Sequence, residues 1–363
     1  MRTLRVFLLV GVLGWVVVAL SVDAQAPVMC SLRWSVPVSV CADSEACFLR
    51  VRPSSNGDLY VWSVRDAVLY VFAAEGAEFT AFDLSAYAAL LSGPRADLVP
   101  LDDAVLFASF TTQGYLFSRY TFGATLGTMH TVNLPSAYHF APCDHAATPP
   151  LHDFQQVEDD QHVLVCTQTM PARFGEPPLV ELRNLDVSAL TVSDPLLSVP
   201  KSMGETIGLL PWTKVVAGRD GNVYIQVRDR NAFGSVFPRL DRYAENLEIV
   251  LRYRPGSTTW DAIGIERPRL SRSIPPESSP ALPRLVAVDA ASNLYFYTMW
   301  YTVGATHVDL TQTNADGEVL WSLTENDLGA GLYWHGLIAP GRFLIAEGTR
   351  DGAVLTRIWE CAR

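Results

Sequence analysis

Apolar and polar residues alternate along this chain in a pattern that recurs. A turn rich in Gly, Asn or Asp leads into an apolar and aromatic run of strand length, which is followed by polar residues and a second such run. The first copy starts at residues 55–58 (SNGD) and continues through Leu59–Trp62, Val68–Phe72 and Phe79–Leu84. Strand-length runs separated by short turns predict a three-strand antiparallel meander.

Further runs of the same kind follow, separated by uneven distances. They start at Val105, Val163, Val223, Leu294 and Phe343. The extra length falls where turn and breaker residues cluster, and there we expect long surface loops. These insertions are Leu134–Pro150, Pro171–Pro178, Pro195–Pro211 and Glu266–Pro283.

One helix is predicted among the strands. It covers Ser85–Ser92, with Asp83 before it as a cap and Gly93 and Pro94 after it as a stop. Elsewhere β-branched and aromatic runs dominate.

Successive meanders must bury an apolar face and hide their sheet edges, and radial stacking of four-stranded blades does both. The expected fold is therefore all-β: a single six- or seven-bladed β-propeller of antiparallel meanders with long inserted loops, spanning residues 25–363. Two β-sandwich domains are the alternative. No linker-like stretch divides the chain, which favours one domain.

Four short segments resemble known propeller families. RDGNVYIQV (residues 219–227) and AVDAASNLYFYT (287–298) are similar to the NHL-type pattern, in which an Asp-Gly-Asn turn leads into an apolar strand. TNADGEVLWSL (313–323) and PGSTTW (255–260) resemble the quinoprotein-like blade, in which Gly is followed by a strand carrying Trp. The resemblance implies a propeller but no particular activity. Most units lack the Gly and Trp pair, so a pyrroloquinoline quinone cofactor is not implied.

The N-terminus reads as a secretory signal peptide. Arg2 and Arg5 precede the uncharged apolar run Val6–Val22, and small residues follow it. We expect residues 1–24 to be removed by cleavage after Ala24, which makes the mature chain extracytoplasmic, either periplasmic or secreted. An uncleaved membrane anchor is the alternative, because the run is nearly long enough to span a bilayer. No later stretch is that long and apolar, so no membrane insertion is expected after cleavage.

An exported chain meets an oxidising environment, and this one has an even number of cysteines, six. Disulfides are therefore expected, although the sequence alone does not choose the pairing. The pairing that we expect is Cys41 with Cys47, Cys143 with Cys166, and Cys30 with Cys361. Buried free thiols are the alternative.

Composition and charge limit the classes of partner that the protein could bind. The chain is 49% hydrophobic, enough for a large core, and its net charge of −11 argues against nucleic acid as a partner.

Histidines and acidic residues gather in one stretch. The histidines are His130, His139, His145, His152 and His162; the acidic residues are Asp144, Asp153, Glu158, Asp159 and Asp160. Such donors suit Zn or Mn, and the acidic triplet suits Ca²⁺, but the spacing matches no compact metal motif. A solvated loop and an acidic turn are the simpler interpretations, and no metal site is assigned. Cys143, beside two of these residues, could be a thiol nucleophile, but a disulfide is the more usual fate of an exported cysteine.

Other candidate residues have structural interpretations too. Asp220–Asn222 and Asp316–Gly317 read as hairpin turns. Three arginines in a Pro-rich loop could dock an acidic partner or lie in solvent. They are Arg267, Arg269 and Arg272.

Two sets of aromatic residues could form the base of a sugar- or peptide-binding surface, or could fill the core between blades. The first comprises Tyr295–Tyr297 with Trp300 and Tyr301, and the second is Tyr333–His335. Core burial is the more common role of such residues in alternating strands.

The chain carries no G-x-S-x-G, H-E-x-x-H or phosphate-loop motif, so catalytic residues stay unknown and no cofactor is expected. The favoured hypothesis is an exported, non-enzymatic propeller scaffold that binds a protein or cell-envelope ligand. The alternative is an envelope glycan hydrolase or lyase that uses carboxylates or a bound metal in the central funnel. Convergence of His139, His145 and His152 on one point would favour the enzyme.

Overall fold

The computed structural model describes most of the chain after residue 28, with gaps between strands. The described residues are 29–38, 49–54, 56–63, 66–73, 78–91, 97–101, 104–111, 114–122, 130–133, 154–156, 162–169, 179–200, 212–227, 242–243, 247–254, 260–266, 283–302, 305–324, 332–348 and 354–362. This part of the chain is all-β except for one short helical segment.

The described strands form six antiparallel sheets, which we number in chain order. Sheet 1 is β2 (Leu49–Pro53), β3 (Leu59–Ser63), β4 (Val68–Phe72) and β5 (Phe79–Asp83). Sheet 2 is β6 (Asp97–Pro100), β7 (Ala104–Thr111), β8 (Gly114–Thr121) and β9 (His130–Asn133). Sheet 3 is β10 (Phe154–Gln156), β11 (His162–Thr169), β12 (Leu179–Asp186), β13 (Thr191–Val192) and β14 (Leu197–Pro200).

The remaining sheets follow the same order. Sheet 4 is β15 (Trp212–Ala217), β16 (Val223–Val227), β17 (Leu247–Tyr253) and β18 (Trp260–Glu266). Sheet 5 is β19 (Arg284–Val288), β20 (Leu294–Thr302), β21 (Ala305–Thr313) and β22 (Val319–Thr324). Sheet 6 is β23 (Leu332–Ala339), β24 (Arg342–Gly348), β25 (Val354–Ala362) and, from the other end of the chain, β1 (Met29–Val38).

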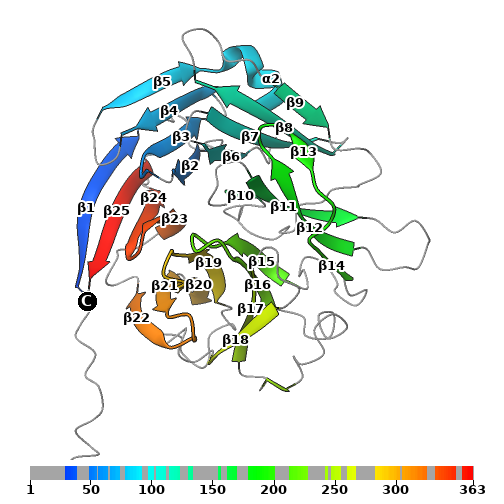
Figure 1. Cartoon of the computed structure of the whole chain (residues 1–363). Helices are drawn as coiled ribbons and strands as arrows, with labels where there is room; N and C mark the ends of the chain where they lie inside the picture. The colour runs from blue at the N-terminus through cyan, green and yellow to red at the C-terminus, as the bar shows by residue number, and fades with distance from the viewer. Residues whose placement is uncertain are drawn as a thin grey trace, which may run out of the picture.

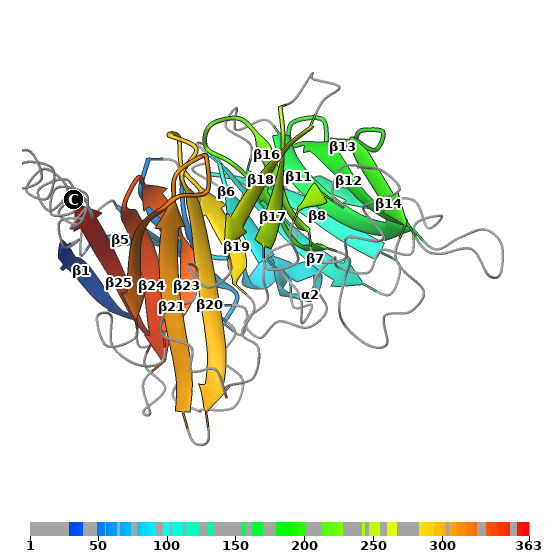
Figure 2. The same cartoon turned by 90° about the horizontal axis from the view of Figure 1, so that it is seen from below.

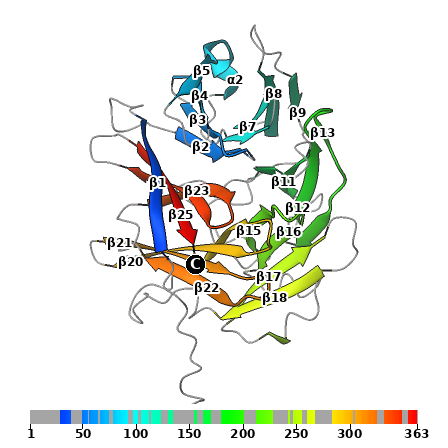
Figure 3. The ribbon, with the colours of Figure 1, turned by 60° about the vertical axis from the view of Figure 1, so that its left-hand side comes forward.

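Sheet 6 joins the two ends of the described chain. β1 pairs antiparallel with β25, so that Cys30 lies opposite Cys361 and Ser31 opposite Glu360, with a register shift between Leu32 and Trp34. The two strands lie side by side in Figures 1 and 3. The two ends of the described chain therefore meet in one sheet.

The first strand of each sheet contacts the first strand of the next one. The contacts run from β2 to β6, β10, β15, β19 and β23, and β23 in turn contacts β2. These six strands surround the middle of the molecule in Figure 1, with the later strands of each sheet farther out. The sheets therefore follow one another around a common centre.

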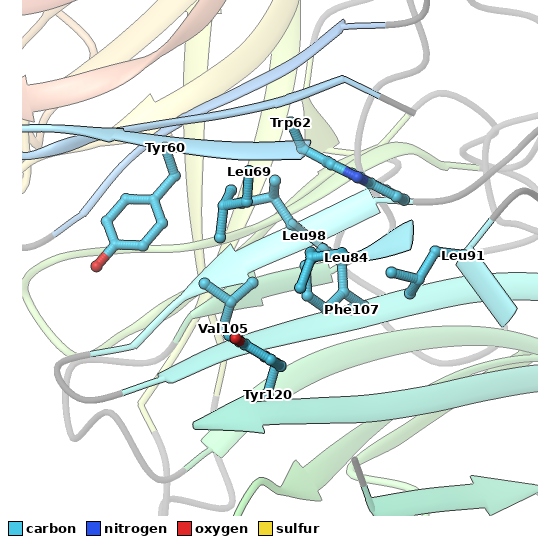
Figure 4. Close-up of a cluster of buried hydrophobic side chains, with 9 residues drawn as sticks. All are labelled: Tyr60, Trp62, Leu69, Leu84, Leu91, Leu98, Val105, Phe107 and Tyr120. Carbon is cyan, nitrogen blue, oxygen red and sulfur yellow. The ribbon is translucent and has the colours of Figure 1, made fainter. Parts of the chain in front are cut away.

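Neighbouring sheets pack through apolar side chains. Between sheets 1 and 2, Trp62 meets Phe107 edge to face with ring centroids 5.0 Å apart. Leu84 and Leu91 add to this cluster (Figure 4). A second cluster joins sheets 4 and 5, and a third joins sheets 5 and 6, which lie next to each other in Figure 2. Apolar faces are thus buried on both sides of sheet 5.

The sequence pattern located the second strand of every sheet. The runs starting at Leu59, Val105, Val163, Val223, Leu294 and Phe343 fall in β3, β7, β11, β16, β20 and β24. The predicted helix is confirmed as a 3-10 turn, η1 (Ser85–Tyr87), followed by α2 (Ala88–Leu91). The predicted cap at Asp83 is wrong, because Leu84 is the N-cap and makes no side-chain capping bond. The Asp83 carboxylate, one residue earlier, accepts a 2.8 Å hydrogen bond from Ser85 N.

One predicted loop is partly wrong. Within Pro195–Pro211, the segment Leu197–Pro200 is β14, which pairs with β12. β13 pairs with the other end of β12, so the two short strands together take the place of a fourth strand. The prolines at positions 195 and 200 hid this strand, because proline marks loops and is otherwise confined to sheet edges.

Because the strands of each sheet run up and down, the connections between them lie at the two ends of the strands. Here these two ends are called edges. First-to-second and third-to-fourth strand turns lie at one edge, which we call the turn edge. Second-to-third strand connections and the crossings from sheet to sheet lie at the other, the connection edge. Polar groups of sheets 4, 5 and 6 meet at the turn edge.

Candidate functional site

Four turns at the turn edge share one backbone conformation. Their first residues, Ser54, Gly218, Asp289 and Asn314, each donate N–H to the carbonyl four residues on and accept a hydrogen bond from the N–H three residues on. The fourth residue of each turn has a positive φ, which favours glycine. Glycine stands there in three turns, and Ser292 stands in the fourth with φ 62°. The hairpin turns predicted at Asp220–Asn222 and Asp316–Gly317 are therefore confirmed.

Asp220 links the turns of sheets 4 and 5. Its Oδ2 accepts hydrogen bonds from the Tyr224 hydroxyl (2.5 Å), Ser292 Oγ (2.6 Å) and Asn222 Nδ2 (2.8 Å). Burial alone would raise the pKa of Asp220, but the hydrogen bonds from Ser292, Tyr224 and Asn222 together outweigh it, so this pKa lies below its ordinary value. Asp220 is therefore held as an anion.

The buried Asp289 side chain stabilises the turn between β19 and β20. Its buried carboxylate accepts hydrogen bonds from the backbone N–H groups of Ala291 and Asn293, both at 2.9 Å. The Tyr295 hydroxyl donates to the other oxygen at 3.1 Å and itself accepts from Gln312 Nε2 and Gly341 N. Burial, and then the nearby Asp289 charge, raise the pKa of Tyr295 despite the opposing bond from Gly341. The hydroxyl thus joins sheets 5 and 6 as a neutral group.

Arg219 extends this network across three sheets. Its backbone N–H, in the sheet 4 turn, donates to Val288 O of sheet 5 at 3.1 Å. Its guanidinium donates to the carbonyls of Leu337 and Ile338, which belong to β23 of sheet 6. Burial lowers the pKa of this guanidinium and the Asp289 charge opposes the shift, but an arginine keeps its charge in proteins.

Sheets 4 and 5 share a second polar contact at the connection edge. Gln226 Nε2 donates to Glu248 Oε1 at 2.6 Å and to Pro283 O at 2.7 Å, and Gln226 Oε1 accepts from Leu285 N at 2.9 Å. Gln226 and Glu248 are fully buried. Both polar networks therefore use their side chains to join neighbouring sheets.

The aromatic residues divide between the two interpretations. Tyr295 and Phe296 are fully buried, and Tyr297 packs against the cluster between sheets 5 and 6, so core burial is confirmed for the first two. Trp300 and Tyr301 lie in β20, and Tyr333–His335 lie in β23. Only the backbone of these five residues is described, so their role stays a prediction.

The structure leaves most of the stretch rich in histidine and acidic residues untested. His130 begins β9 opposite Arg119, and His162 begins β11 opposite Asp186. The other candidates lie outside the described residues: His139, His145, His152, Cys143, Asp144, Asp153, Glu158, Asp159, Asp160, Arg267, Arg269 and Arg272. Residues 1–24, Cys41 and Cys47 also lie outside them. Within the described ranges, no three His, Cys, Asp or Glu side chains are grouped so as to hold a metal, and no helix could cross a membrane.

The sequence did not predict the hydrogen bonds that Arg219 makes between sheets or those that Asp289 makes within its turn. A signal was present, because both turns end in the pattern Asn-aliphatic-Tyr, at residues 222–224 and 293–295. In both cases the tyrosine hydroxyl donates a hydrogen bond to the aspartate of its own turn. The contacts between sheets left no such local signal.

No protein-family model matches the chain, and no curated protein is similar to it in sequence. Solved structures are similar to it in fold. A Bacteroides fragilis protein thought to be exported has 11% identity and a TM-score of 0.49, covering 94% of this chain and 98% of its own. Virginiamycin B lyase from Staphylococcus aureus has 9% identity and a TM-score of 0.40, with 91% and 99% covered. PQQ-bound aldose sugar dehydrogenase from Streptomyces coelicolor has 10% identity and a TM-score of 0.44, with 93% and 99% covered.

These three are propeller-type proteins, the class that the NHL-type and quinoprotein-like segments resemble. Identities this low assign neither an activity nor a ligand to this chain.

Proposed function

We propose that the protein is an exported, closed six-bladed β-propeller that serves as a non-enzymatic scaffold for a protein or cell-envelope ligand. One observation carries the proposal: the first strands of the six sheets contact one another in a complete cycle, and β1 completes the last sheet. A ring closed in this way leaves no large apolar sheet face open and holds its connections on a rigid base.

The connection edge is the face that we assign to the ligand. The turn edge of sheets 4, 5 and 6 is occupied by its own hydrogen bonds, such as those from Ser292 to Asp220 and from Arg219 to Leu337. At the connection edge, strands instead end and begin far apart in the sequence, at Val227 and Leu247 and at Glu266 and Arg284. Connections carried by a rigid scaffold are where proteins commonly place binding residues.

The Asp220 carboxylate is poorly suited to act as a general acid at neutral pH. A general acid works best with a pKa near the working pH. Hydrogen bonds to Asp220 move its pKa the other way, and those bonds orient it toward its own turn and its neighbour. Export rests on the basic, apolar and small-residue order of residues 1–24.

The test uses residues 25–363 immobilised and exposed to two probes: a detergent-solubilised envelope extract of the source organism, and purified peptidoglycan. The variant replaces residues 228–246 by a short Gly-Ser linker. Asp316→Asn, an exposed change at the turn edge, is the matched control.

We expect the wild type and the control to retain a ligand from one of the two probes. The linker variant should retain at least tenfold less of it. Circular dichroism should show all three proteins equally folded. Retention of nothing from either probe contradicts the proposal. Equal retention by the linker variant contradicts the placement of the ligand, and turnover of peptidoglycan favours the glycan enzyme instead.

A further inference from the structure

Two cysteines from opposite ends of the chain are backbone register partners in one sheet. Cys30 is the second residue of β1, and Cys361 is the second-last residue of β25. The backbone register makes them direct partners, between Met29 with Ala362 and Ser31 with Glu360. The register shift in this pair of strands comes later, between Leu32 and Trp34. The pairing of the two cysteines therefore lies in an uninterrupted stretch of the ladder.

Direct partners in an antiparallel ladder have α-carbons about 4.5–5.5 Å apart. Disulfides join residues whose α-carbons lie about 4.4–6.8 Å apart. The backbone alone thus brings the two residues within bonding range without any movement of the strands. The register thus supports the pairing of Cys30 with Cys361 that we expect from the sequence.

We propose that Cys30 and Cys361 form an oxidation site whose disulfide joins the first strand to the last and makes the closure of sheet 6 covalent. The oxidant is a protein or small-molecule disulfide. One cysteine thiolate attacks it to form a mixed disulfide, and the other displaces the oxidant's sulfur. Two S–H bonds of this chain and the oxidant's S–S bond break, one S–S bond forms in the chain, and the oxidant leaves as two thiols.

The position of the pair sets the order of events. The two cysteines come together only when β1 has paired with β25, so the bond forms after the sheet is complete. Once formed, it prevents β1 from leaving and exposing the edge of β25, which would be open to pairing with another chain. Because the closed loop spans nearly the whole chain, the bond restricts the unfolded state strongly.

The first test is a peptide map of residues 25–363, purified from an oxidising compartment, blocked with iodoacetamide and digested without reductant. We expect a cross-linked peptide pair containing Cys30 and Cys361 that separates after reduction. Alkylated Cys30 or Cys361 in most of the protein, or a cross-link from either residue to a different cysteine, overturns the proposal. This map needs no variant and therefore decides the matter even if the variants fold poorly.

The second test compares thermal unfolding of Cys30→Ser, Cys361→Ser and the double variant, with Ser31→Ala as the neighbouring control. We expect both single variants and the double variant to melt about 10 °C below the wild type and to agree with one another, because each loses the same bond. The control should melt with the wild type. A double variant that melts with the wild type contradicts the proposal.

The inference rests on the register of β1 and β25 and not on the proposed ligand. Failure of the cross-link with ligand binding intact overturns the covalent closure alone. A confirmed cross-link without ligand retention overturns the binding function alone.

Discussion

Ser292 shows at the scale of one residue how a local cost is offset by a contact between sheets. It occupies the positive-φ position that glycine fills at Gly57, Gly221 and Gly317. A left-handed conformation costs a residue with a β-carbon about 1–2 kcal/mol. Serine supplies something that glycine lacks, a hydroxyl that donates to the Asp220 carboxylate of the neighbouring sheet.

Two substitutions separate these contributions. Ser292→Ala keeps the conformational cost and loses a hydrogen bond to a charged group, so we expect the free energy of unfolding to fall by about 1.5–3 kcal/mol. Ser292→Gly loses the same bond but relieves the conformation, so its loss should be about 1 kcal/mol smaller. Urea unfolding of both variants is the measurement. Equal stability of Ser292→Ala and the wild type would show that the bond contributes nothing.

Asp220 gives the protein a pH dependence with a defined sign. Its pKa is lowered in the folded state by the bonds from Ser292, Tyr224 and Asn222, after burial is overcome. A lowered folded pKa contributes stability above the ordinary value of about 3.9, and that contribution is lost as the pH falls through the folded pKa. The free energy of unfolding of the wild type should therefore fall between about pH 5 and pH 2. In Asp220→Asn we expect this fall to be smaller.

The control for this titration is Asp316→Asn. Asp316 stands at the same position of its own turn, but its side chain is exposed. Denaturant midpoints measured across the acid range should follow the wild-type curve for Asp316→Asn and a flatter curve for Asp220→Asn. Identical curves for the two variants would remove Asp220 as a source of the pH dependence.

At the scale of elements, Arg219 joins parts of three sheets through a single residue. Its donors reach the carbonyls of Leu337 and Ile338 in β23 while its backbone holds Val288 of β19. Arg219→Met keeps much of the apolar stem but leaves two carbonyls without this donor. We expect a loss of about 2–4 kcal/mol in the free energy of unfolding. Arg254→Met, at an exposed position, should change it by less than about 0.5 kcal/mol, and equal losses would contradict the linking role.

The short helical segment is a packing element for sheets 1 and 2. Leu91 is 2% exposed and lies in the cluster with Trp62 and Phe107 (Figure 4). We expect Leu91→Ala to lower the free energy of unfolding by about 2–4 kcal/mol, because it leaves a cavity between the sheets. Ala89→Ser, on the exposed side of the same helix, should cost about 0.5 kcal/mol or less in urea unfolding. A loss for Leu91→Ala no larger than that of the control would place the segment outside the core.

The sequence revealed those elements whose own residues carry the signal. The second strands are buried on both faces, as in β3 and β16, so their apolar runs are continuous and easily found. Two of the first strands, Leu49–Pro53 and Asp97–Pro100, are short, polar in part and end in proline, so nothing local distinguishes them from loops. Their strand character comes from pairing with a neighbour.

The polar network was less predictable than the strands. The turns at Asp220 and Asp316 were visible because Gly and Asn mark positive φ. The partners of Arg219 lie more than one hundred residues away along the chain, at Leu337 and Ile338. The packing of sheets 4, 5 and 6 brings them together, and no pattern within one turn encodes that contact.

In the molecule as a whole, one topological feature joins the two ends of the described chain. Sheets 1 to 5 are each built from consecutive strands, but sheet 6 takes three strands from the end of the chain and one from its beginning. The inner strands then form a continuous circuit of contacts. The pairing of β1 with β25 completes the last of the six sheets, and we expect the stability of the circuit to depend on it.

A distance measurement tests this pairing most directly. Genetically encoded spin labels placed at Ser31 and Glu360, and in a second sample at Val36 and Thr356, mark two pairs of register partners. The account predicts short label-to-label distances, below about 20 Å in both samples, because partners in a ladder have α-carbons about 5 Å apart. Distances above about 30 Å in either sample of the folded protein would contradict the closed ring.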